Sequence, residues 1–173
     1  MSKSKKIDPL QIIVEEGNKI QFYGAKNQNG LFSNFYKSPI KLKGKIWQTT
    51  EHYFQAQKFA GTSKEEEVRN APGPGTAFRL GRKKDKQFPI RNDWEKAKNT
   101  VMYEAIKAKF TQHDNLKQIL LSTKNNIIIE HTKRDAYWGD GGDGKGKNTL
   151  GILLMKLRKE LSAENKKEET QQN

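Results

Sequence analysis

The 173-residue sequence contains no cysteine, and this absence excludes several kinds of chemistry. Disulfide bonds, thiolate nucleophiles and the cysteine-ligated zinc sites of nucleobase deaminases all need that residue. Histidine is scarce as well, and His52, His113 and His131 do not form the i, i+4 pair of a helical zinc site. The sequence also has no G-x-S-x-G motif, which argues against a serine hydrolase with a nucleophile elbow.

Long apolar stretches are missing too. No run approaches the roughly 18 apolar residues that a membrane-spanning helix needs. The N-terminal residues Met-Ser-Lys-Ser-Lys-Lys lack the apolar region of a secretory signal peptide. Together with the missing cysteine, these features predict an intracellular, cytoplasmic protein that does not contact a membrane. At this length the chain is most simply one domain, long enough to bury a core.

Positive charge is what the sequence has in excess. The formal net charge is +13, and residues 20–161 carry all of it, with 27 Lys and Arg against 14 Asp and Glu. The basic character therefore belongs to the folded part of the chain. Such an excess favours an anionic partner, either a phosphorylated small molecule or nucleic acid. A lysine-rich solvated surface is the plainer explanation, and charge alone does not decide between them.

Hydrophobic periodicity and turn residues predict a helix-rich, mainly α single domain of the α+β class with a small β-hairpin component. Strands are expected at Ile12–Val14, Lys19–Tyr23, Ile40–Leu42, Lys45–Trp47 and Ile127–Glu130, with a hairpin turn at Lys43-Gly44. Helices are expected at 49–61, 63–70, 92–110, 114–120 and from 149, the third being the longest and the second opening with a capping box at Ser63. The domain is placed at residues 12–161, between a disordered N-terminus, residues 1–11, and a frayed polar tail, residues 162–173.

The first helix after the hairpin carries an unusual motif. Thr49 or Thr50 can cap it. At 3.6 residues per turn, Glu51, Gln55 and Lys58 share one face. A single carboxylate on a helix otherwise rich in aromatic residues makes Glu51 a candidate functional group. The alternative is that Glu51 only stabilises the helix, because acidic residues favour the positive end of the helix dipole.

Residues 135–148 form a second unusual motif, Asp-Ala-Tyr-Trp-Gly-Asp-Gly-Gly-Asp-Gly-Lys-Gly-Lys-Asn. It comes close to a P-loop, but Asn148 stands where the Mg²⁺-binding Ser or Thr belongs, and no strand runs directly into it. A P-loop NTPase is therefore disfavoured, although glycine-rich backbone before a helix can still bind an anion. The alternative is a flexible surface loop. Tyr137 and Trp138 argue against it, because exposing two aromatic side chains to solvent costs free energy. Three residues of the motif are open to acid–base, metal-binding or turn-forming roles: Asp135, Asp140 and Asp143.

Both motifs resemble those of the YbiA-like family, also called NADAR. The matching stretches are Glu-His-Tyr-Phe-Gln-Ala-Gln-Lys-Phe within Trp47–Phe59 and the glycine-rich motif at 135–148. Shorter stretches match in the same order: Phe22-Tyr23, Phe32-Ser33-Asn34-Phe35, Gly81-Arg82 and Arg91-x-x-Trp94. The resemblance covers roughly residues 20–161 and implies a helix-rich fold with small β elements.

This resemblance implies an N-glycosidase. Some relatives hydrolyse ribosylaminopyrimidine phosphates, the early intermediates of riboflavin biosynthesis, to ribose 5-phosphate and a pyrimidine, which removes reactive metabolites. Others remove ADP-ribose from guanine in nucleic acid. Both reactions break a bond between ribose and nitrogen, so the resemblance alone does not choose between them. A domain that binds ADP-ribose or nucleic acid without turnover is a third hypothesis, and an intact carboxylate at Glu51 argues against it.

The resemblance also implies roles for individual residues. Glu51 matches the catalytic glutamate, which stabilises an oxocarbenium-like centre and activates water. A second carboxylate would assist it, with Asp135 preferred and Asp140 next. No metal or cofactor is needed for this chemistry, and the oligomeric state stays open.

The expected substrate contacts are aromatic, cationic and glycine-rich. Stacking on the base is expected from Trp138 and from Phe22 or Tyr23. Phosphate binding is expected from Lys58, Arg82 and the Gly144–Asn148 backbone. The other expected substrate contacts are Asn34, Trp94, Gly139, Lys147 and Asn148.

Overall fold

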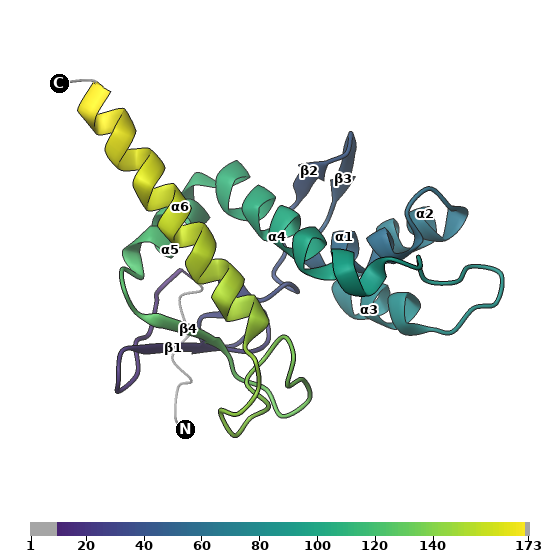
Figure 1. The fold of residues 1–173 in the computed structure, drawn as a ribbon, viewed down its shortest axis with the longest axis horizontal. Helices are drawn as coiled ribbons and strands as arrows, with labels where there is room; N and C mark the ends of the chain where they lie inside the picture. Colours follow the sequence, from purple (N-terminus) through teal and green to yellow (C-terminus); the bar gives the residue numbers. More distant parts are fainter. Residues whose placement is uncertain (1–9, 172–173) are drawn as a thin grey trace, which may run out of the picture. The chain divides into compact units, whose positions relative to one another are not determined.

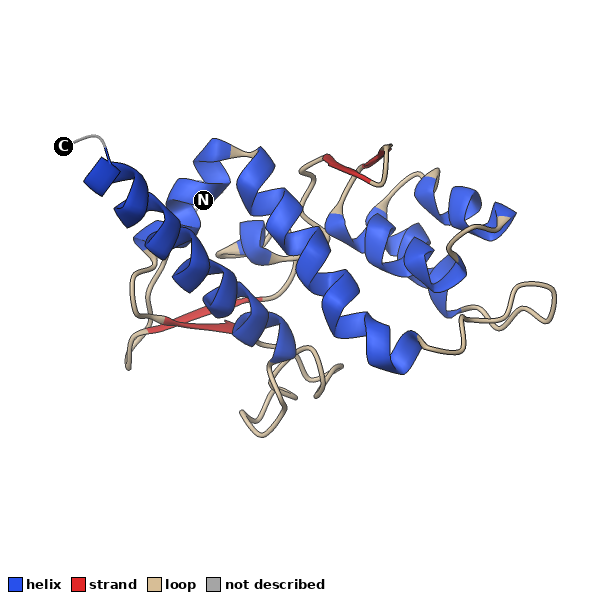
Figure 2. Cartoon of the chain, turned by 45° about the horizontal axis from the view of Figure 1, so that its top comes forward, coloured by secondary structure: helices blue, strands red, loops and turns tan. Residues whose placement is uncertain are grey.

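The computed structural model describes residues 10–171. Helices predominate in this part of the chain, which confirms the expected helix-rich α+β class (Figure 2). The described residues fall into two compact units. The terminal unit comprises residues 10–33 and 115–171, from both ends of the chain, and the central unit comprises residues 34–114. The expected disordered N-terminus lies almost wholly outside the described residues.

The terminal unit is built on a parallel pair of strands, β1 (Lys19–Phe22) and β4 (Ile127–Glu130) (Figure 1). Their register joins Lys19 to Ile127 and Phe22 to Glu130, so segments far apart in the sequence lie side by side. A short 3-10 helix, η1 (Gly30–Phe32), follows β1, and α5 (Asp114–Ser122) precedes β4. Both strands were expected, whereas nothing local to either segment indicates their pairing.

The strand expected at Ile12–Val14 is wrong, and the hydrogen bonds show why. Asn29 Oδ1 accepts the N–H of Ile13 at 2.9 Å, and Asn29 Nδ2 donates to the carbonyl of Ile13 at 2.9 Å. Both backbone groups of Ile13 are thereby satisfied without a strand partner. Only an isolated bridge between Glu15 and Lys19 forms nearby.

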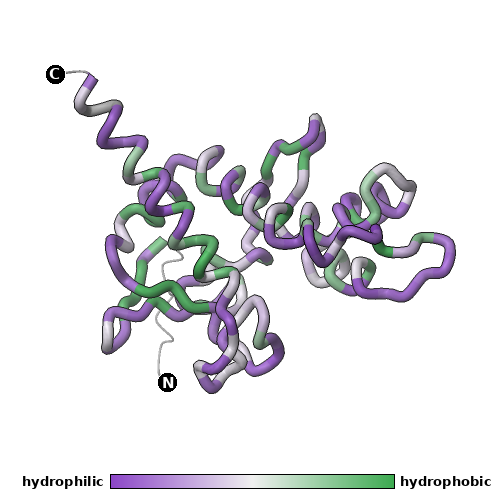
Figure 3. The backbone as a smooth tube through the Cα atoms, viewed as in Figure 1, coloured by the Kyte–Doolittle hydropathy of each residue, from purple (hydrophilic) through white to green (hydrophobic). Residues whose placement is uncertain are grey.

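Helix α6 (Thr149–Gln171) packs against β4 and supplies an apolar face to the core of the terminal unit. Its buried leucines recur at helical spacing, at Leu150, Leu154, Leu157 and Leu161. A Cβ at Gly151 would lie 2.1 Å from the carbonyl oxygen of Ile128, so glycine lets the helix and the strand approach closely. The later turns are mostly polar (Figure 3), yet α6 continues to Gln171. The expected boundary at residue 161 therefore does not mark the end of the helix.

The central unit begins with the hairpin that the sequence predicts, β2 (Ile40–Leu42) paired with β3 (Lys45–Trp47). The φ angles of Lys43, 51°, and Gly44, 73°, are positive, as in the type I′ turn that matches the twist of paired strands. The helices that follow are α1 (Thr50–Ala56), α2 (Ser63–Arg69), α3 (Pro74–Arg82) and α4 (Trp94–Gln112), with a 3-10 turn, η2 (Gln57–Phe59), after α1. Every residue of α1 is buried, because the helix packs against α2, α3 and α4.

Two helices differ from the expectation. The sequence does not predict α3, because its prolines and glycines suggest a break. Pro74 instead opens the helix, where its fixed φ and missing N–H are tolerated. The longest helix is α6, with 23 residues, rather than α4, with 19. No helix among residues 10–171 combines the length and the apolar character needed to cross a membrane.

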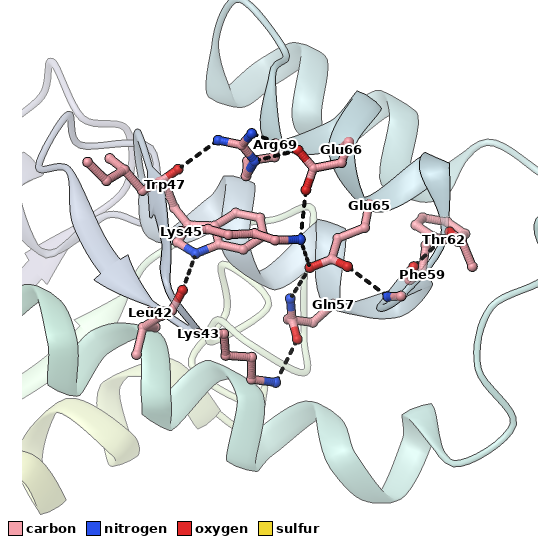
Figure 4. Close-up of polar contacts among 12 residues, drawn as sticks. Leu42, Lys43, Lys45, Trp47, Gln57, Phe59, Thr62, Glu65, Glu66 and Arg69 are labelled. Atoms are coloured by element: carbon pink, nitrogen blue, oxygen red, sulfur yellow. Dashed lines mark hydrogen bonds and ion pairs between the residues drawn. The ribbon is translucent and has the colours of Figure 1, made fainter.

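Ion pairs and hydrogen bonds connect the hairpin to α2 (Figure 4). Lys45 Nζ lies 3.3 Å from a carboxylate oxygen of Glu65 and 2.7 Å from one of Glu66. Glu65 also accepts the backbone N–H of Gly61 at 2.7 Å. The capping box expected at Ser63 is wrong, because the N-cap is Thr62 and the carboxylate that should complete the box, Glu66, pairs with Lys45 and Arg69 instead.

Candidate active site

The first turn of α1 is fixed by the segment that precedes the hairpin. The backbone carbonyl of Asn34 accepts the N–H of Glu51 at 3.2 Å, and Asn34 Oδ1 accepts the hydroxyl of Thr50 at 2.9 Å. Thr49 is the N-cap, and its hydroxyl accepts the N–H of His52 at 3.3 Å. Asn34, which was expected to contact substrate, thus positions the residue expected to be catalytic.

Glu51 is buried, with 5% of its surface exposed. Burial raises the pKa of its carboxyl to about 7, although the hydrogen bond from Gln55 and the charges of Lys58 and Arg82 act to lower that pKa. Gln55 Nε2 donates to Glu51 Oε1 at 2.8 Å from one turn further along the helix, as the predicted shared face requires. A carboxyl that exchanges its proton near neutral pH suits general acid–base chemistry.

Lys58 is a second buried charge of this group, with 8% exposed. Its Nζ donates to the carbonyl of Gly81 at 3.1 Å and lies 5.7 Å from the centre of the Trp94 ring. Burial lowers the pKa of Lys58 to about 8, against the raising effect of Glu51. Trp94 is itself buried against Phe54, with ring centres 5.0 Å apart, so its contacts here are with Lys58 and the core.

Gln55 is the member of the group that the site prediction missed. Its Oε1 is buried and has no hydrogen-bond partner among residues 10–171. The side chain is pressed against α3, where a Cβ at Gly81 would lie 2.1 Å from Gln55 Oε1 and 2.7 Å from Gln55 Cβ. Gly81 therefore leaves the space in which Gln55 reaches Glu51. The i, i+4 spacing from Glu51 was the available signal.

We expect Gly81→Ala to lower both turnover and the free energy of unfolding, because the added methyl group must displace Gln55. Overpacking of this kind costs about 1–3 kcal/mol. Losing the Gln55 hydrogen bond should raise the pKa of Glu51 further and move the acidic limb of the pH–rate profile to higher pH. Gly75→Ala is the matched control in the same helix, because nothing lies within 4 Å of a Cβ at that position. An unshifted profile in Gly81→Ala would argue against the role of Gln55.

Arg82 is the exposed cation of the central group. Its guanidinium carbon lies 5.0 Å from the centre of the Phe78 ring, which in turn packs on Phe35 at 6.2 Å. With Lys83 and Lys84 it lines a cavity of about 270 Å³. A guanidinium held on an aromatic ring beside an open cavity suits the binding of an anionic group.

In the terminal unit, Asp140 ties the glycine-rich motif to the end of β4. Asp140 Oδ2 accepts from His131 Nδ1 at 2.8 Å, while Oδ1 accepts the N–H groups of Thr132 at 3.2 Å and Gly142 at 2.8 Å. Burial raises the pKa of Asp140, but these hydrogen bonds outweigh it and the pKa is lowered overall. Because both oxygens are engaged, Asp140 anchors the motif and orients His131.

Asp135 opens the motif as a turn former. Its Oδ1 accepts the N–H groups of Tyr137 and Trp138, both at 2.8 Å. The two rings pack edge to face with their centres 5.1 Å apart, and Lys147 Nζ lies 5.3 Å from the centre of the Tyr137 ring. The motif thus has its own ordered packing, as the aromatic residues suggested.

The hydrogen bonds argue against the phosphate cradle expected from the Gly144–Asn148 backbone. The N–H groups of residues 145–148 all donate to oxygen atoms of the same motif, at 2.7–3.0 Å. The Asn148 side chain is also engaged, because it donates to the carbonyl of Ile128 at 2.8 Å and accepts the N–H of Glu130 at 3.0 Å. These donors hold the chain together and are not directed at a ligand.

The two aromatic residues at the end of β1 differ in their surroundings. Phe22 is 2% exposed, and its ring centre lies 5.8 Å from that of Phe32, so it belongs to the core. Tyr23 is 44% exposed and is the one of the two that is open to a ligand. Gly139 is buried, and a Cβ there would lie 2.6 Å from Thr132 Cγ2, so its role is to let the motif pack.

The predicted site residues thus form two groups, one in each unit. The central group contains Asn34, Glu51, Lys58, Arg82 and Trp94. The terminal group contains Phe22, Tyr23, Asp135, Trp138, Gly139, Asp140, Lys147 and Asn148. The sequence-based prediction missed Gln55, Gly81 and the orientation of His131. No cluster of three or more His, Asp and Glu side chains that could hold a metal ion occurs in the part of the chain described.

Comparison with known proteins points to one family. The NADAR domain matches residues 21–162. The N-glycosidase YbiA of Escherichia coli strain K12 is 52% identical over 145 residues, which cover 84% of this chain and 89% of that protein. The chloroplastic riboflavin biosynthesis protein PYRR of Zea mays is 40% identical over 168 residues, covering 90% of this chain and 27% of that protein. The NMR structure of E. coli YbiA matches with a TM-score of 0.78 and 50% identity, over 88% of this chain and 89% of that one.

Proposed function

The chain belongs to the NADAR domain family, and we propose that it hydrolyses the ribose–nitrogen bond of ribosylaminopyrimidine phosphates, the early intermediates of riboflavin biosynthesis. Its similarity to N-glycosidases over most of its length makes it a hydrolase acting on N-glycosyl bonds. Relatives named as riboflavin biosynthesis proteins support the proposed substrate class. The observation that carries the proposal is Glu51, a buried carboxyl with a pKa of about 7 that lies beside Gln55 and two cations.

Glu51 performs the central step of this proposal. As the C1′–N bond breaks, its electron pair leaves with the nitrogen, positive charge develops on the ribose ring, and water attacks C1′. Ionised Glu51 stabilises that charge and accepts a proton from the water. Lys58 supports the ionised form, because its charge opposes the effect of burial on the pKa of Glu51. The products are ribose 5-phosphate and a pyrimidine.

The remaining roles are proposed for other side chains of the predicted site. Asp135 is preferred over Asp140 as the carboxyl that protonates the leaving nitrogen, because both oxygens of Asp140 already accept hydrogen bonds. Trp138 and Tyr23 are the candidates for stacking on the base, since Phe22 is buried in the core. Arg82 is the exposed candidate for binding an anionic group near Glu51.

Removal of ADP-ribose from guanine in nucleic acid is the second candidate function. It breaks the same kind of bond, and the net charge of +13 favours a polyanionic substrate. A domain that binds without turnover is disfavoured by the environment of Glu51. Incubating the pure protein with each substrate class and measuring the released base tests all three. We expect release of the pyrimidine. Release of guanine alone would select the second candidate, and release of neither would select the third.

Charge reversal at three exposed lysines should separate the two substrate classes. If the substrate is a small metabolite whose phosphate contacts Arg82 but neither Lys83 nor Lys84, although both line the same cavity, replacing Lys83, Lys84 and Lys86 by Glu should leave kcat/KM within a few-fold of wild type. Exposed charges that do not touch the substrate contribute little. If the substrate is nucleic acid, each lysine that contacts the backbone would add to the salt dependence of binding. The measurements are hydrolysis of ribosylaminopyrimidine phosphate and DNA binding at several salt concentrations.

A control variant with the same change of charge uses three other exposed lysines of the central unit: Lys41, Lys96 and Lys107. We expect both triple variants to behave alike. A large loss of hydrolysis confined to the first variant, or strong DNA binding that only the first variant abolishes, would contradict the small-metabolite proposal.

A further inference from the structure

The terminal unit contains a basic pocket whose cations have no role in the reaction proposed above. The cavity has a volume of about 300 Å³ and is lined by Tyr23, His131, Thr132, Lys133 and Arg134. We propose that this pocket binds a phosphate monoester group, with Lys133, Arg134 and the imidazolium form of His131, through its Nε2–H, as the donors.

The histidine is held in one orientation by the chain around it. The backbone N–H of His131 donates to the carbonyl of Phe22 at 2.8 Å, which fixes the residue at the end of the strand pair. Its Nδ1 lies 2.8 Å from Asp140 Oδ2, while 45% of the side chain is exposed. Because Nδ1 is occupied, Nε2 is the nitrogen left for a ligand. A carboxylate behind an imidazole orients the ring in this way at ligand-binding sites generally.

Two glycines of the second motif pack closely against the residues that line this pocket. A Cβ at Gly142 would lie 2.3 Å from Lys133 Cγ, and a Cβ at Gly139 would lie 2.6 Å from Thr132 Cγ2. Glycine at these positions lets the motif pack directly against residues 131–134, which carry the cations. The motif therefore serves to place Asp140 behind His131, which accounts for its P-loop-like composition although its amides are engaged.

The charge in the pocket is not balanced. Lys133 and Arg134 are exposed, and within residues 10–171 neither forms an ion pair. The only acidic group that faces His131 among the contacts described is Asp140, whose two oxygens are already occupied. An imidazolium, an ammonium and a guanidinium around one cavity match the three outer oxygens of a phosphate monoester. The exposed ring of Tyr23 supplies a wall for the sugar or base attached to it.

A second basic cavity in the same unit provides the comparison. It has a volume of about 490 Å³, and its cations are Lys124, Arg158, Lys159 and Lys166. Arg158 is engaged there, because it donates to Thr123 Oγ1 and to the carbonyl of Asn126, both at 2.8 Å. This cavity has neither an imidazole nor an aromatic ring, so it serves as a control for surface charge.

Titration of the full-length protein tests the proposal without turnover. Ribose 5-phosphate, inorganic phosphate and ribose are added separately, and the imidazole resonances of His131 and the dissociation constant are measured. We expect the two phosphates, but not ribose, to shift the His131 resonances. Lys133→Gln with Arg134→Gln should weaken binding by about tenfold or more, because two charge-assisted hydrogen bonds are lost. His131→Gln should also weaken it, and His113→Gln should not.

The charge control is Lys124→Gln with Lys159→Gln, which should change the affinity by less than about twofold, as expected of exposed charges. Equal weakening by the two double variants would reduce the effect to surface charge and overturn the proposal, as would unshifted His131 resonances. The source of the phosphate is decided separately and rests on the proposed function. A raised KM of Lys133→Gln with Arg134→Gln would identify the substrate's own phosphate, and an unchanged KM would identify a separate phosphate ligand. If the wild type cleaves no riboside at all, the proposed function fails, whereas the titration still decides the pocket.

Discussion

Glu51→Gln is expected to abolish turnover while leaving the fold intact. The amide has nearly the same shape as the carboxyl, but it can neither accept a proton from water nor offset the positive charge that develops on the ribose. If this loss resembles that of one oxyanion-hole donor, it amounts to about 2.7–4 kcal/mol, or a 10²–10³-fold lower kcat. The measurement is single-turnover release of the base from ribosylaminopyrimidine phosphate, together with circular dichroism to establish folding.

The matched control is Glu67→Gln, which makes the same substitution in the central unit. Glu67 is half exposed and pairs with Lys64 at 2.9 Å, so its loss should leave kcat close to wild type. The substrate should also bind Glu51→Gln with little change in affinity, because the carboxylate acts mainly on the transition state. A Glu51→Gln rate near that of the wild type would remove Glu51 from the mechanism.

Features that depend on neighbouring residues could be predicted from the sequence. The hairpin follows from alternation around Lys43-Gly44, and the cap at Thr49 places Glu51 in a first turn. Pairing of β1 with β4 could not be predicted, because each strand finds its partner across most of the chain. The segment around Ile13 shows the same limit, since a distant Asn29 side chain satisfies its backbone in place of a strand.

The candidate site shows the same difference between features set by local spacing and features that depend on distant residues. Helical spacing alone places Glu51, Gln55 and Lys58 on one face. The orientation of Gln55, however, depends on the absence of a side chain at Gly81 in another helix, which no local pattern reveals. In the glycine-rich motif, composition favours an anion-binding backbone. The fold instead turns those amides onto the motif's own oxygens, and it brings Asp140 to His131.

The second large effect concerns stability. Glu51→Gln should raise the free energy of unfolding above neutral pH. A carboxyl whose pKa is raised on folding, here from 4.5 to about 7, contributes stability below pH 4.5 that is lost as pH rises towards 7. Above pH 7 the folded protein keeps a buried charge that the unfolded chain leaves in water. The difference between the two pKa values corresponds to about 3 kcal/mol of stability, which the wild type loses as pH rises. The glutamine variant has no carboxyl at this position and does not lose it.

Urea unfolding of wild type and Glu51→Gln at pH 5 and pH 8 measures this difference. Near pH 5 most of the carboxyl is protonated in the folded state, so the two proteins should be similar. At pH 8 the variant should be more stable by up to about 3 kcal/mol, with Glu67→Gln showing no such gain. An advantage of equal size at both pH values would point to packing instead, and a more stable wild type at pH 8 would mean that Lys58 and Arg82 fully compensate the buried charge. The expected result means that the carboxylate needed for catalysis lowers the stability of the fold. Burial raises its pKa above the value it would have in water, and this suits catalysis but destabilises the folded state above neutral pH.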